Sequence, residues 1–131
     1  MELEVGMYVR TKWGYICKII NINDFREPSM KYGVEASYLK DIMFIGDDDI
    51  SKASHSLLGN NEEPCLIEED DYVNGDIVTK IKEDEQNNKY IVTIFNDVYY
   101  DKDIKSIVTK EMFSSMSYKV GDGNESNRFI K

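Results

Sequence analysis

Few residues of this chain are suited to acid–base chemistry at neutral pH. His55 is its one histidine, so general acid or base catalysis would use this imidazole or a carboxyl group of shifted pKa. Ser54 and Ser56 flank it, but neighbours on a strand point to opposite faces, so neither is placed as a nucleophile for His55. The sequence has no nucleophile elbow, phosphate-binding loop or His-Glu-x-x-His motif. We therefore expect no enzyme and no catalytic residue.

The potential metal ligands are poorly spaced. Cys17, His55 and Cys65 lie far apart and lack the Cys-x-x-Cys pairs that mark zinc sites. Three aspartates come nearer to an oxygen-ligand set but lack the glycine and the bidentate glutamate of a calcium loop: Asp97, Asp101 and Asp103. We predict neither a metal nor a cofactor.

Carboxylates dominate the charge of the chain. It has 25 acidic and 16 basic residues, a net charge of −9, which opposes binding to nucleic-acid phosphates or anionic lipid. The acids gather in runs at predicted turns, where closely spaced carboxylates can imitate a row of phosphates and occupy a basic groove. They can also, at the same time, keep strand edges from pairing and the protein soluble. The two runs that we assign to a partner contact are Asp47, Asp48 and Asp49, and Glu68, Glu69, Asp70 and Asp71.

Aromatic residues offer a second kind of contact. Most of the nine tyrosines fall at alternating positions that predict core or sheet lining. Trp13 stands beside Gly14 at a predicted turn, so we expect this indole to be exposed and to join the acidic residues in the partner contact. An alternative site would bind a small nucleotide, with basic groups for its phosphate and a ring for its base: Arg10, Lys12, Lys18, Arg26, Lys31 and Tyr15.

These residues are carried by a sequence that nearly repeats itself. Tyr8-Val9 recurs as Tyr72-Val73, 64 positions later, and each copy passes a glycine into an alternating apolar run. Asp49-Ile50 recurs as Asp103-Ile104, now 54 positions later, so the second copy has a shorter middle. This spacing is about the size of one small all-β module.

The apolar patterning predicts strands in both copies. Residues 5–22 form a hairpin signal about Gly14, and its second half is apolar on both faces, with Ile16, Ile20 and Ile22 on the face opposite Cys17. Strand-like composition returns at 32–45, and a short strand or helical turn is expected at 50–58. In the second copy we predict strands at 66–68, 72–73, 77–82, 90–95, 98–100 and 117–120, with a short helix at 109–114.

The predicted fold class is mainly β, with two tandem SH3-like small β-barrel modules. Their bounds are 1–58 and 65–120, joined by a Gly, Asn and Pro-containing linker at 59–64 and followed by a flexible tail at 121–131. A single mixed α+β domain is the rival architecture. The start lacks a secretory signal and no apolar run approaches a membrane span, so we expect a cytoplasmic protein.

Four stretches, 1–12, 52–56, 69–75 and 103–113, resemble a family of small uncharacterised proteins carried by phages and prophages of low-GC Gram-positive bacteria. Their motifs concern strand and turn patterning and carry no assigned chemistry. The insertion at 59–64, the aspartate run at 47–49 and the long tail depart from that pattern. The resemblance implies an origin in a mobile element, whose small accessory proteins often act on host machinery, including immune systems.

The leading hypothesis is a non-enzymatic phage accessory protein that binds and inhibits a host defence component, such as a CRISPR effector, through acidic groups and Trp13. The alternative is a protein that sequesters a small nucleotide signal in the groove between the modules. A third hypothesis is a structural or transcription-associated protein that holds another protein with a Tudor- or KOW-type barrel. The expected partner is a host protein with a basic surface, without direct nucleic acid or membrane contact, and a monomer and a homodimer both remain open.

Overall fold

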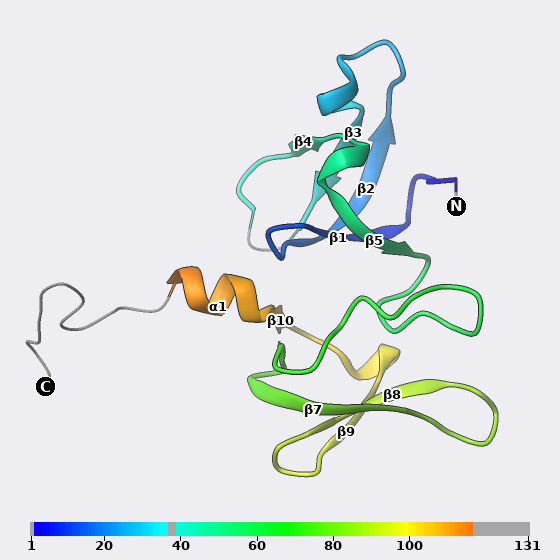
Figure 1. Ribbon diagram of the computed structural model, residues 1–131, viewed down its shortest axis with the longest axis vertical. Coiled ribbons are helices and arrows are strands. Elements are labelled where there is room, and N and C mark those ends of the chain that lie inside the picture. Colours follow the sequence, from blue (N-terminus) through cyan, green and yellow to red (C-terminus); the bar gives the residue numbers. More distant parts are fainter. Residues whose placement is uncertain (1, 37–38, 117–131) are drawn as a thin grey trace, which may run out of the picture.

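The computed structural model describes residues 2–36 and 39–116. They form two five-stranded antiparallel sheets and one short α-helix (Figure 1). The first sheet contains β1 (Tyr8–Thr11), β2 (Ile16–Ile22), β3 (Tyr32–Glu35), β4 (Met43–Ile45) and β5 (Ile50–Ser54). The second contains β6 (Tyr72–Val73), β7 (Asp76–Glu83), β8 (Lys89–Thr93), β9 (Val98–Tyr100) and β10 (Ile107–Val108). The remaining elements are the 3₁₀ turns η1 (Pro28–Met30), η2 (Asp47–Asp49) and η3 (Asp101–Asp103), and the helix α1 (Lys110–Met116).

The two sheets have the same topology. Their strand orders are β4-β3-β2-β1-β5 and β9-β8-β7-β6-β10, so four strands follow one another and the fifth pairs with the first. Val9 lies opposite Ala53 in one sheet and Val73 opposite Ile107 in the other. The first strands are thus offset by 64 residues and the fifth by 54, as the sequence repeat predicts. The mainly β fold class is confirmed, while both sheets stay open, since no ladder in the described part of the chain joins their outer strands.

The turn before the fifth strand is also duplicated. The backbone N–H of Gly46 donates to Asp49 Oδ2 at 2.9 Å in η2, and that of Tyr100 donates to Asp103 Oδ2 at 3.0 Å in η3. The aspartate side chain closes the turn on itself in both copies, which explains why Asp-Ile recurs there. The repeat therefore extends to a specific hydrogen bond.

The strand β2 is central in its sheet and apolar on both faces, as predicted. Cys17 and Ile19 belong to the first core, whereas Ile16 packs with Leu66 and Val73 in the second. A register shift between Ile19 and Asn21 interrupts the alternation. Ile22 for this reason packs against the first core, and the expectation that it shares a face with Ile16 is wrong.

Because Ile16 belongs to the second core, the two sheets are packed against each other through apolar side chains. In Figure 1 the first sheet lies above the second, and α1 lies at the level where they meet. Thr109 caps this helix, since its Oγ1 accepts the N–H of Met112 at 3.2 Å. None of the helices in the described ranges has the length and apolar character needed to span a membrane.

Some predicted elements differ from the structure. The stretch 66–68 is not a strand, although Leu66 and Ile67 are buried, because its polar backbone bonds to side chains and to the loop at Leu57 instead of to a strand. Val5 lies in a turn before β1 and is 60% exposed. The predicted strand at 117–120 and the tail at 121–131 fall outside the described residues.

Candidate functional site

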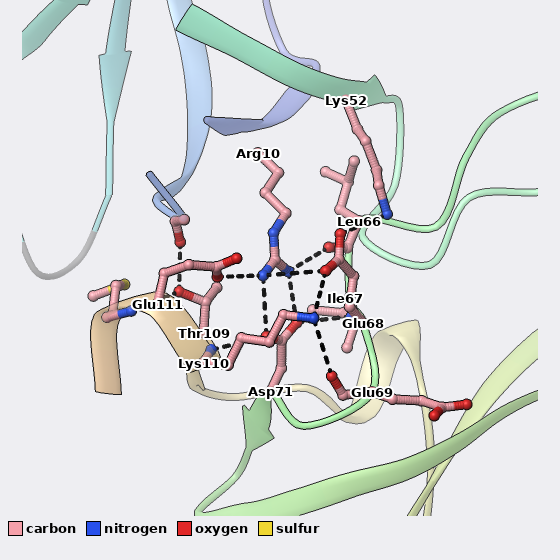
Figure 2. A network of polar contacts seen from close by, with 12 residues as sticks. Arg10, Lys52, Leu66, Ile67, Glu68, Glu69, Asp71, Thr109, Lys110 and Glu111 are labelled. Atoms are coloured by element: carbon pink, nitrogen blue, oxygen red, sulfur yellow. Dashed lines mark hydrogen bonds and ion pairs between the residues drawn. The ribbon is translucent and has the colours of Figure 1, made fainter. Parts of the chain in front are cut away.

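The most concentrated polar chemistry lies where the two sheets meet, around the guanidinium of Arg10 on β1 (Figure 2). Its Nη1 donates to Asp71 Oδ2 at 2.6 Å and to the carbonyl of Leu66 at 2.9 Å. Its Nη2 donates to Asp71 Oδ1 at 3.1 Å and to Glu111 Oε1 at 2.7 Å. Arg10 is 2% exposed, and the N–H donors of its guanidinium bind acceptors of the protein itself.

Asp71, directly before β6, completes the arrangement from the second half of the chain. It is fully buried, and its carboxylate also accepts the backbone N–H groups of Glu68, at 2.7 Å, and of Lys110, at 3.0 Å. One carboxylate thus joins β1, the loop before β6 and the start of α1. A buried charge needs such a complete set of partners, because an unpaired one costs several kcal/mol.

Glu68 forms the outer layer of the same cluster. Its carboxylate forms ion pairs with Lys52 Nζ at 2.8 Å and with Lys110 Nζ at 2.9 Å, and it lies 3.7 Å from Arg10 Nη2. Partial burial by itself raises the pKa of Glu68, but the hydrogen bonds from Lys52 and Lys110 and the charge of Arg10 outweigh it and lower the pKa to about 2. We call these six residues the Arg10 cluster: Arg10, Lys52, Glu68, Asp71, Lys110 and Glu111.

The turn of the first hairpin is pressed against the same place. The Thr109 hydroxyl donates to the carbonyl of Gly14 at 2.6 Å. Gly14 has a φ of +95°, and a Cβ there would lie 2.5 Å from the Cβ of Glu111. Trp13, next to it, is 43% exposed and meets the Tyr15 ring edge-on at 6.0 Å. In this turn Gly14 is buried and the Trp13 indole is partly exposed, as expected for Trp13.

The acidic residues assigned to a partner contact are divided by the fold. Asp71 is buried and Glu68 is held by two lysines, so the expectation that the run 68–71 presents four carboxylates to a partner is corrected. Glu69 and Asp70 are exposed. In the other run Asp48 is exposed, Asp47 accepts the Tyr32 hydroxyl at 2.6 Å and Asp49 closes η2.

The basic residues of the alternative nucleotide site do not form one cluster. Arg10 is buried against Asp71, which removes it from that site. Arg26 donates to Asn21 and lies 4.7 Å from the Phe44 ring, and Lys31 pairs with Asp24 at 3.4 Å. Lys12 and Lys18 of this set are exposed, and Tyr15, Arg26 and Lys31 are half-buried.

His55 has both ring nitrogens engaged. Nδ1 lies 2.5 Å from Glu63 Oε2 and Nε2 lies 3.0 Å from Glu4 Oε1, and these two carboxylates raise the pKa of the imidazole. Ser54 is buried and donates to Glu63 at 3.0 Å instead of to His55. The arrangement is a surface histidine hydrogen-bonded to two carboxylates, and through Glu63 it connects the expected linker 59–64 to the end of β5.

Lys52, Lys110 and Glu111 are members of the Arg10 cluster that sequence reasoning missed. The signal available in the sequence was Arg10 itself, a charged residue that follows Val9 inside the predicted hairpin 5–22. In the structure the residues on either side of it, Val9 and Thr11, are buried. No family model, no curated protein and no solved structure matches this chain.

Proposed function

We propose that this chain is a non-enzymatic, phage-encoded accessory protein that binds and inhibits a host defence component with a basic surface. The observation that carries the proposal is the position of its charge. The Arg10 cluster contains three cations and three anions, so its formal charge is zero and the whole net charge of −9 belongs to residues outside it. Such an excess of carboxylates favours encounter with a basic partner.

The proposed contact consists of the assigned residues that stay accessible. Trp13 supplies a partly exposed indole, the type of side chain that most often dominates binding energy at interfaces. Exposed carboxylates accompany it: Asp47, Asp48, Glu69 and Asp70.

The duplicated topology supports an assignment of both halves as SH3-like modules of the Tudor or KOW kind. In each, the fifth strand follows a 3₁₀ turn and pairs with the first strand. The Arg10 cluster and the second core join the modules, so both can meet one partner without first being ordered relative to each other. This rigidity lowers the entropic cost of association.

The test is inhibition of a defence system followed by binding to its purified effector. A low-GC Gram-positive host with an active CRISPR system is challenged with a targeted phage, with and without the expressed chain. We expect the chain to restore plaque formation and to bind the guide-loaded effector, with affinity that falls as salt rises from 0.05 to 0.5 M, since screening weakens exposed charge pairs (about 10 Å Debye length at 0.1 M).

Two charge-reversed variants locate the contact. Asp48→Lys/Glu69→Lys changes the proposed contact, and Glu83→Lys/Glu85→Lys changes the net charge equally at the exposed end of the β7–β8 hairpin. We expect the first variant to lose affinity and the second to keep most of it. Equal loss in both variants, or a salt-insensitive complex, contradicts the proposed contact, and unchanged phage restriction contradicts the function.

A further inference from the structure

A cavity of about 440 Å³ opens between the two sheets, on the side of β1 and β2 that faces the second core. Its apolar lining comes from both sheets and from α1: Tyr8, Ile16, Leu57, Ile104, Ile107 and Met112. This volume lies within the range of small-molecule sites, about 300–1,000 Å³, which often form between packed domains. The cavity is distinct from the Arg10 cluster, with which it shares no residue.

Two ammonium groups accompany this apolar lining. Lys18 comes from β2 and Lys105 from the segment between η3 and β10, and both residues are exposed. Lys18 Nζ lies 5.9 Å from the centroid of the Tyr8 ring, and neither ammonium forms an ion pair within the described ranges. Two cations beside one cavity stand out in a chain whose net charge is −9.

The segment that carries Lys105 is held in place by the side-chain amide of Asn74. The N–H groups of Lys105 and Ser106 donate to Asn74 Oδ1 at 2.7 and 3.1 Å, and Asn74 Nδ2 donates to the carbonyl of Asp103 at 2.9 Å. Asn74 is in the turn between β6 and β7, so this side of the cavity is formed before any ligand arrives. Preorganisation of this kind reduces the cost of binding.

One carboxylate limits the charge that the cavity accepts. Glu35 also lines it and lies opposite Lys18 in the β2–β3 register. With two ammoniums and one carboxylate, the formal charge of these lining groups is +1, which suits a ligand with a single negative charge better than a polyphosphate.

We propose that this cavity binds a small organic monoanion. The aromatic or apolar body of the ligand packs on Tyr8 and the aliphatic lining, and its sulfonate, carboxylate or phosphodiester group lies within reach of Lys18 and Lys105. The proposal is independent of the partner-binding function, because it uses none of the residues assigned to the partner contact.

The test uses two fluorescent probes of the same skeleton, the anionic 8-anilinonaphthalene-1-sulfonate and the uncharged N-phenyl-1-naphthylamine. We expect saturable one-to-one binding of the anion to the folded chain. Lys18→Ala/Lys105→Ala should weaken it about tenfold, from two partly exposed ion pairs, and leave the uncharged probe within about twofold. Lys80→Ala/Lys82→Ala, which removes two exposed lysines of β7, is the matched control and should change neither affinity.

A third variant tests the location. Ser106→Trp places a large ring at the exposed edge of the cavity and keeps the backbone bond to Asn74, so both probes should bind at least tenfold more weakly. Circular dichroism confirms that each variant is folded. The proposal is overturned if binding of the anionic probe does not saturate. It is also overturned if the two double-lysine variants bind that probe with equal affinity, or if Ser106→Trp binds both probes as the wild type does.

Discussion

Arg10 and Asp71 are 61 positions apart in sequence and form a buried, two-pronged ion pair, with N–O distances of 2.6 and 3.1 Å. Asp71→Asn leaves the guanidinium buried without its counter-charge. We expect a loss of about 3–5 kcal/mol in the free energy of unfolding, measured by urea denaturation. Glu69→Gln, a change of an exposed neighbour, should stay within about 0.5 kcal/mol of the wild type.

The double variant Arg10→Met/Asp71→Leu separates pairing from packing. Removal of both charges should recover part of the loss, because no unpaired ion remains. Recovery stays incomplete, since the N–H groups of Glu68 and Lys110 lose their acceptor. If Asp71→Asn is as stable as the wild type, the pair does not hold the sheets together.

The pH dependence of stability follows from Glu68. Its pKa falls from an ordinary 4.5 to about 2 in the folded protein. A lowered carboxyl pKa means that the stabilisation is fully present above about pH 4.5 and is lost as the pH falls through about 2. We expect the melting temperature to fall across that window, and Glu68→Gln to make the fall shallower. A melting curve with the same pH dependence in Glu68→Gln and Glu69→Gln would contradict this assignment.

The sequence predicts the elements of this fold better than it predicts their meeting points. Local chemistry is enough for the turn at Asn74-Gly75, where both residues have positive φ, and for the two-sided strand β2. The alternation of apolar and polar residues predicts on which face of its strand Arg10 lies. It does not predict which distant residue contacts Arg10.

The acidic run 68–71 shows the same limit. Its four side chains look alike in sequence, yet Asp71 is buried, Glu68 is clamped by lysines, and Glu69 and Asp70 are exposed. Asp70 has a φ of +78°, so the backbone reverses its course there and sends neighbouring carboxylates in different directions. This conformation depends on contacts with β1 and α1, which no local pattern records.

Two glycines with similar positive φ values test the contact between the first hairpin and α1. Gly14 and Gly75 have φ values of +95° and +89°, but only Gly14 has a neighbour where a Cβ would stand, the Glu111 Cβ at 2.5 Å. Gly75→Ala should cost about 1 kcal/mol of stability from backbone strain alone. Gly14→Ala should cost at least about 2 kcal/mol, because α1 must also move away.

Denaturation of both variants in urea measures the difference. A second measurement is the stacking of Tyr72 on Phe113, whose ring centroids are 4.7 Å apart on β6 and α1. Displacement of α1 in Gly14→Ala should shift the ring resonances of Phe113, while Gly75→Ala should leave them in place. Equal losses in the free energy of unfolding for the two substitutions would show that the first hairpin is not in close contact with α1.

His55 gives a prediction that a single resonance can test, because the chain has one histidine. Its imidazole lies between Glu4 and Glu63, and the hydrogen bonds to these two carboxylates raise its pKa above the ordinary 6.5. A raised histidine pKa contributes stability that is fully present below about pH 6.5 and is lost as the pH rises through the folded value. Titration of the ring resonance by NMR should therefore give a midpoint above 6.5. Glu4→Gln and Glu63→Gln should each lower the midpoint, whereas Glu62→Gln should not, and a wild-type midpoint at or below the ordinary value would rule out these ion pairs in solution.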